Sequence, residues 1–129
     1  MVHISAISIV DDDASVRESL LGLLRSLGYT VTIFNCAEQF IQSPQAIGTD
    51  GLFLDVQMPG MSGIELQDQL RKKLATIPII FITARGDERT RSQALGGGAI
   101  AFLVKPINEE MVLSALKSAL KTDISPKSN

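Results

Sequence analysis

The strongest strand signal of the chain lies at residues 78–83, which read PIIFIT. The run is apolar and rich in β-branched residues until it ends at Thr83. Continuous apolar strands are typical of parallel sheets that are covered by helices on both faces, because neither face of such a strand meets water. The segments on either side of this run show which fold it belongs to.

Four more strand-like runs occur along the chain, and each of the five runs is followed by a segment with helical periodicity. The expected strands, besides residues 78–83, are residues 6–10, 29–34, 51–55 and 100–104. The expected helices are residues 13–27, 37–42, 62–74 and 87–95, with a last one that carries residues 111–120. This alternation favours an α/β fold in which a five-stranded parallel sheet has helices on both faces.

Local signals mark several helix ends. Ser62 and Glu65 have the spacing of a capping box, and Asn35 and Glu38 have the same spacing before the short second helix. Gly28 is expected to cap the end of the first helix, and the three glycines at 96–98 are expected to end the fourth. Residues 44–50 are expected to form a loop.

Length and composition indicate one globular domain. The chain has 129 residues, of which 45% are hydrophobic and 20% charged, with a net charge of −2. This balance gives no broad attraction to nucleic acid or to an anionic membrane. No apolar run reaches the roughly 20 residues of a membrane helix, and the single Cys36 favours a reducing compartment, so we expect a cytoplasmic protein. Residues 1–121 are expected to form the domain, and residues 122–129 a polar tail or the start of a linker.

Polar residues from distant segments fall at the carboxyl ends of the expected strands. These residues are Asp11, Asp12, Asp55, Thr83 and Lys105. Because the carboxyl ends of parallel strands open on one edge of a sheet, where α/β folds place their ligands, we expect the five side chains to converge there. Asp13, the next aspartate, is expected only to cap the first helix.

Charge indicates what such a cluster does. Carboxylates in close contact repel each other by about 4 kcal/mol per pair at an effective dielectric constant near 20. Lys105 supplies one compensating charge, and an all-oxygen site without histidine or thiol suits Mg²⁺, which shares phosphate ligands readily. Asp55 is then free to act as a nucleophile, while Thr83 donates its hydroxyl to a phosphoryl oxygen. The residues therefore predict a phosphoryl-transfer site.

Four motifs resemble the receiver domain of two-component response regulators. They are VDDD at residues 10–13, LDVQMPGMSG at 54–63, ITA at 82–84 and VKP at 104–106. The resemblance extends from about Ser5 to Leu120, and the runs VDDD and VRESL (residues 16–20) are similar to receivers of LuxR-type transcription regulators. It implies the flavodoxin-like fold of the CheY-like superfamily, with strand order 2-1-3-4-5.

The resemblance also implies a role for each site residue. Asp55 would be the phosphoacceptor, and Asp11 and Asp12 would bind Mg²⁺ (with Mn²⁺ or Ca²⁺ as substitutes) together with Asp55 and the backbone carbonyl of Gln57. Thr83 would be the switch hydroxyl and Lys105 the cation that binds the phosphoryl group. Phe102 occupies the position of the switch aromatic residue, and the Lys105–Pro106 peptide bond is expected to be cis.

The implied activity is that of a signalling switch rather than an enzyme, with self-catalysed phosphorylation and dephosphorylation only. A sensor histidine kinase or a phosphotransfer protein would supply the phosphoryl group, and phosphorylation could produce a homodimer. The domain itself would not bind nucleic acid or membrane. The resemblance also allows a C-terminal DNA-binding domain beyond Asn129. Two alternatives are an aspartate-nucleophile phosphatase, which typically has an acid where Gln57 stands, and a degenerate receiver that serves only for docking.

Overall fold

The computed structural model describes residues 5–73 and 77–120. The expected end of the third helix at Leu74 and the expected tail at 122–129 lie outside these residues. The strands are β1 (Ala6–Val10), β2 (Thr30–Phe34), β3 (Gly51–Asp55), β4 (Ile79–Thr83) and β5 (Ala101–Val104). The helices are α1 (Ala14–Ser26), α2 (Ala37–Gln42), α3 (Gly63–Lys73), α4 (Glu88–Gly96) and α5 (Glu109–Ala119), with a 3-10 turn η1 at Pro44–Ala46.

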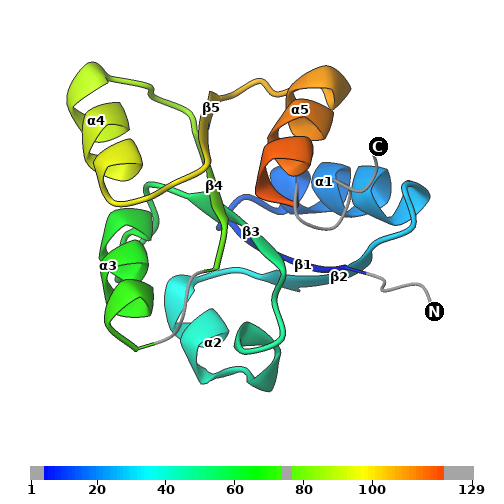
Figure 1. Ribbon diagram of the computed structural model, residues 1–129, viewed down its shortest axis with the longest axis horizontal. Helices are drawn as coiled ribbons and strands as arrows, with labels where there is room; N and C mark the ends of the chain where they lie inside the picture. Colours follow the sequence, from blue (N-terminus) through cyan, green and yellow to red (C-terminus); the bar gives the residue numbers. More distant parts are fainter. Residues whose placement is uncertain (1–4, 74–76, 121–129) are drawn as a thin grey trace, which may run out of the picture.

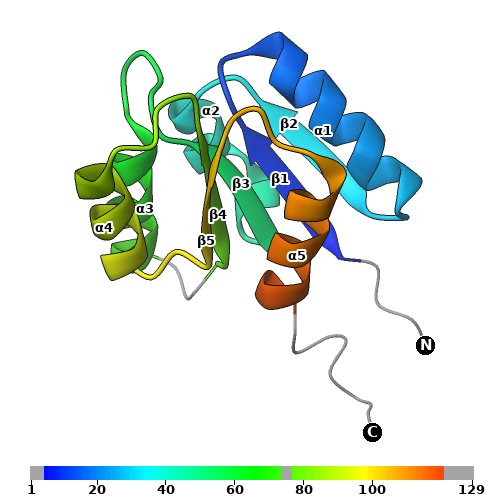
Figure 2. The ribbon, with the colours of Figure 1, turned by 90° about the horizontal axis from the view of Figure 1, so that it is seen from above.

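The five strands form one parallel sheet in the order β2-β1-β3-β4-β5. Helices α1 and α5 lie on one face of the sheet, and α2, α3 and α4 lie on the other (Figures 1 and 2). The predicted α/β architecture and strand order are therefore confirmed. Within the described residues, the helices are all too short or too polar to span a bilayer.

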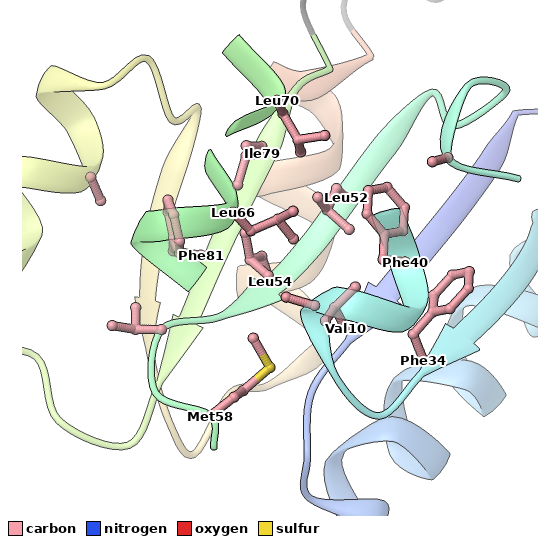
Figure 3. Close-up of a cluster of buried hydrophobic side chains, with 14 residues drawn as sticks. Val10, Phe34, Phe40, Leu52, Leu54, Met58, Leu66, Leu70, Ile79 and Phe81 are labelled. Atoms are coloured by element: carbon pink, nitrogen blue, oxygen red, sulfur yellow. The ribbon is translucent and has the colours of Figure 1, made fainter. Parts of the chain in front are cut away.

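The core consists of two hydrophobic clusters that the sheet separates. Successive strand residues point to opposite faces, so Leu52 and Leu54 of β3 join the cluster under α2, α3 and α4, whereas Phe53 joins the cluster under α1 and α5. The first cluster is shown in Figure 3, where Val10, Leu54 and Phe81 come from three adjacent strands. Burial on both faces explains why these strands read as continuous apolar runs.

Most of the expected helix ends agree with the structure. Ser62 and Glu65 form the reciprocal capping box, because each side chain accepts a hydrogen bond from the backbone N–H of the other residue. The side chains of Asp13 and Asp87 cap α1 and α4. Gly28 has a positive φ of 95° just after α1, as its capping role requires.

Two local expectations were wrong. The second helix begins after Cys36, which makes no side-chain cap, and the backbone N–H of Asn35 donates to Gln39 Oε1 rather than to Glu38. Glu38 is used elsewhere, because its carboxylate accepts a hydrogen bond from Met61 in another segment. The expected loop at 44–50 contains the 3-10 turn η1, which the side chain of Ser43 caps by accepting the N–H of Gln45.

Candidate functional site

Three acidic side chains meet at the carboxyl edge of the sheet. Val10 pairs with Leu54 in the β1–β3 register, so the next residues on each strand, Asp11 and Asp55, emerge side by side. One carboxylate oxygen from each of Asp11, Asp12 and Asp55 lies within 4.8 Å of the other two. Asp11 and Asp55 are buried, whereas Asp12 is exposed. The acidic cluster is therefore largely buried and reaches solvent through Asp12.

Lys105 joins this cluster from the end of β5. Its Nζ atom lies 3.1 Å from Asp11 Oδ2 and 4.0 Å from Asp55 Oδ2. The Lys105–Pro106 peptide bond is cis. Within the described part of the chain, Lys105 forms ion pairs with two of the three carboxylates, and the remaining excess of negative charge favours a further cation.

Hydrogen bonds hold the loop after β1 in place. Asp11 Oδ1 accepts the backbone N–H of Asp13 at 2.8 Å, and the guanidinium of Arg17 in α1 donates to the carbonyl of Asp11 at 2.7 Å. Asp11 Oδ2 is buried and has no hydrogen-bond partner within the described residues, so its compensation there is the Lys105 ammonium. A cluster of carboxylate oxygens with such an oxygen fits Mg²⁺, whose ligands in proteins are oxygens.

The Asp55 carboxyl has a raised pKa. Burial raises the pKa of Asp55, the negative charge of Asp11 raises it further, and Lys105 lowers it, with a net value of about 7. The ionised form of Asp55 is disfavoured, because its charge is buried and lies beside another carboxylate.

This raised pKa predicts a pH-dependent stability in metal-free buffer. The folded pKa lies above the ordinary value of 3.8, so the contribution of Asp55 is fully present in acid and is lost as the pH rises through about 7. Between about pH 5 and about pH 8 in EDTA, we expect the thermal midpoint of the wild type to fall relative to that of Asp55→Asn. Midpoints that run parallel for the two proteins over this range would refute the raised pKa.

Thr83 and Gln57 lie at the same edge of the sheet, whereas Phe102 lies within β5, where it pairs with Phe81 of β4. The hydroxyl of Thr83 is buried and engages the backbone of Arg85, donating to its carbonyl at 3.0 Å and accepting its N–H at 3.1 Å. Gln57 is exposed, and its backbone N–H donates to Asp55 Oδ1 at 3.4 Å. Phe102 is half-buried, with its ring centroid 6.4 Å from that of Phe81. In this conformation the Thr83 hydroxyl therefore bonds to its own loop.

Gly63 is a site residue that sequence reasoning did not single out. It begins α3, and its N–H donates to the carbonyl of Val56 at 2.8 Å. A Cβ atom at this position would lie 2.1 Å from the carbonyl oxygen of Asp55. Only glycine allows α3 to start this close to the backbone of Asp55. Its place within the motif LDVQMPGMSG was the available signal, but the backbone contact appears only in three dimensions.

The sheet order and the acidic cluster with its lysine define the class of CheY-like α/β domains. A family model described as "Response regulator receiver domain" matches residues 7–117. The chain therefore belongs to the receiver domain family of the response regulators, the signalling proteins of two-component systems.

Individual relatives agree with this assignment. The chain is 42% identical over 125 residues to the response regulator protein TodT of Pseudomonas putida, covering 97% of this chain and 55% of TodT. It is 35% identical over 115 residues to the transcriptional regulatory protein FixJ of Bradyrhizobium diazoefficiens, covering 89% and 56%. The solved structure of response regulator StyR is 46% identical, with a TM-score of 0.81 over 94% of this chain and 61% of that one. The chain thus spans about half the length of these curated relatives.

Proposed function

We propose that Asp55 accepts a phosphoryl group from a sensor histidine kinase or a phosphotransfer protein, and that this modification switches an output surface. The observation that carries the proposal is the cluster in which Asp11, Asp12 and Asp55 lie within 4.8 Å of one another, with Lys105 on the same edge. Phosphotransfer is the general mechanism of the receiver family. Here the cluster supplies a nucleophile, a cation and a set of metal ligands.

In the proposed step, a carboxylate oxygen of Asp55 attacks the phosphorus atom of the donor. A P–O bond to Asp55 forms while the bond from phosphorus to the leaving group breaks, and the leaving group keeps the electron pair and takes a proton from solvent. Lys105 neutralises charge on the transferred group from its place beside Asp11 and Asp55. Asp11, Asp12, Asp55 and the carbonyl of Gln57 would hold Mg²⁺, which supplies charge neutralisation for the phosphoryl oxygens when it is bound.

The switch would act through Thr83 and Phe102. The phosphoryl oxygens offer the Thr83 hydroxyl a stronger acceptor than the carbonyl of Arg85, because a hydrogen bond to a charged acceptor is stronger than one to a neutral acceptor. Movement of Thr83 would draw the loop after β4 toward Asp55 and alter the space in which Phe102 packs beside Phe81. The surface of α4, β5 and α5 would then differ between the two states.

The domain would act as a switch that catalyses only its own phosphorylation and dephosphorylation. It would not convert a separate substrate in repeated cycles. Gln57 supports this proposal, because a neutral amide cannot supply the proton of the general acid that an aspartate-nucleophile phosphatase requires. We propose that residues 1–121 form the receiver unit and that residues 122–129 are a tail or linker. The proposal also includes a cytoplasmic location and dimer formation on phosphorylation. The output would be transcriptional, in line with the name of the transcriptional regulatory protein FixJ.

The direct test is to incubate the protein with acetyl phosphate, with Mg²⁺ or with EDTA, and to measure its intact mass. We expect the mass to increase by one phosphoryl group with Mg²⁺ and not with EDTA. Borohydride reduces an acyl phosphate to an alcohol, so the reduced residue found by peptide mapping should be Asp55. Labelling at another residue, or equal labelling in EDTA, would contradict the proposal. Steady release of phosphate from a phosphomonoester would support the phosphatase alternative instead.

A further inference from the structure

The loop between β3 and α3, residues 56–62, is hydrogen-bonded to helix α2. Glu38 lies in the first turn of α2, and its Oε2 atom accepts the backbone N–H of Met61 at 3.0 Å. The two residues are 23 positions apart, so the bond joins two separate segments rather than capping its own helix. The other end of the loop meets the acceptor, where the N–H of Gln57 donates to Asp55 Oδ1.

The loop is also shaped around the Glu38 carboxylate. Gly60 has a positive φ of 80°, a conformation that side chains with a Cβ rarely adopt. A Cβ atom on Gly60 would lie 2.8 Å from Glu38 Oε2. The glycine therefore gives the carboxylate room to reach the Met61 amide. The positive φ of Gly60 is a separate observation that the loop turns toward Glu38 at this point.

The bond is charge-assisted at neutral pH. Acceptance of the Met61 N–H lowers the pKa of Glu38, so the side chain is ionised under ordinary conditions. Glu38 is exposed and belongs to neither hydrophobic cluster. Its removal should therefore leave the core intact and affect chiefly the loop.

We propose that Glu38 is a positioning residue for the cation-binding loop. By accepting the Met61 N–H, Glu38 would restrict the backbone of residues 57–61 and so help to orient the Gln57 carbonyl, the proposed metal ligand. Glu38 acts through the loop and does not itself touch the acceptor. This inference rests on the proposed function, because it assigns Glu38 a part in the same Mg²⁺ site.

The test compares three variants with the wild type. Glu38→Ala removes the acceptor of the Met61 N–H, and Glu38→Gln keeps a neutral acceptor. Gln39→Ala removes a bond from the neighbouring side chain to the Asn35 backbone just before α2 and leaves the bond to Met61 in place. Binding of Mg²⁺ alone is measured by calorimetry, and hydrogen exchange is measured at the Met61 amide. The rate of labelling by acetyl phosphate is followed over a range of Mg²⁺ concentrations.

We expect Glu38→Ala to weaken Mg²⁺ binding roughly two- to tenfold, the scale of one lost hydrogen bond that orients a metal site. The labelling rate should fall at low Mg²⁺ and return to the wild-type rate at saturating Mg²⁺, while the Met61 amide exchanges faster. Glu38→Gln should recover most of the affinity, and Gln39→Ala should match the wild type.

Two results would overturn the inference. Equal Mg²⁺ affinity in Glu38→Ala and wild type would show that the hydrogen bond between Glu38 and Met61 does not affect metal binding. Equal losses in Glu38→Ala and Glu38→Gln would assign the effect to the charge of Glu38 rather than to its hydrogen bond. Failure of the proposed function looks different, because the wild type itself would then bind no Mg²⁺ or gain no phosphoryl group at Asp55.

Discussion

Replacing Asp55 with asparagine is expected to reduce labelling by acetyl phosphate about a thousandfold or more, the scale on which loss of a nucleophile acts. The neutral amide has nearly the same shape as the carboxylate, so it fits the buried position at the end of β3. It lacks the negative oxygen that attacks phosphorus. Removing one of the crowded charges also relieves the repulsion between Asp55 and Asp11. The variant should therefore be folded, at least as stable as the wild type without metal, and unable to accept a phosphoryl group.

Asp13→Asn is the matched control for this experiment. Asp13 is the next acid along the loop from Asp12, but its side chain is exposed and caps α1 by accepting the N–H of Ser15. Asparagine caps helices equally well, so this variant should be labelled at the wild-type rate. Full labelling of Asp55→Asn, traced by peptide mapping to Asp11 or Asp12, would show that the acceptor has been misassigned.

Replacing Gly63 with alanine is expected to be the most damaging single-methyl change near the site. The added Cβ would lie 2.1 Å from the carbonyl oxygen of Asp55 and 3.1 Å from the Cα of Val56. Both are backbone atoms, so no side chain can rotate away to relieve the contact. The start of α3 must shift, or the end of β3 must shift with Asp55. We expect the free energy of unfolding to fall by about 2 kcal/mol or more.

Urea denaturation measures this loss, and labelling shows whether Asp55 has moved. Gly22→Ala is the control, because Gly22 lies on the exposed side of α1 and its Cβ would meet no atom within 4 Å. Alanine there should raise stability by up to about 1 kcal/mol, since it is the better helix former. A Gly63→Ala protein with wild-type stability and wild-type labelling would mean that the close approach of α3 to Asp55 is not maintained in solution.

Much of this fold could be predicted because its signals are periodic and local. Apolar and β-branched runs marked all five strands, with one-residue differences at the starts of β2, β4 and β5. Once the strands are parallel, the residue that follows each carboxyl end must lie on one edge. That rule alone brought Asp11, Asp55 and Lys105 together, although they are far apart in the chain.

What could not be predicted depends on contacts between segments. The spacing of Asn35 and Glu38 matches a capping box, but the Met61 amide competes for the same carboxylate and the local motif does not form. The clash that reserves position 63 for glycine is with a carbonyl eight residues away. The direction of a hydroxyl such as that of Thr83 depends on the loop that follows it, and no periodic pattern encodes that direction.

The two hydrogen bonds between Thr83 and Arg85 have a consequence for signalling fidelity. Because the Thr83 hydroxyl both donates and accepts a hydrogen bond here, this conformation is a defined energy minimum. Breaking both bonds costs about 1 kcal/mol net for each, about 2 kcal/mol in all, so only a few per cent of unmodified molecules, roughly, leave this conformation unless the hydroxyl finds a new acceptor. In the proposed switch this cost would act as a threshold: it would lower the output of the unmodified protein, and the phosphoryl group would have to supply at least that much free energy.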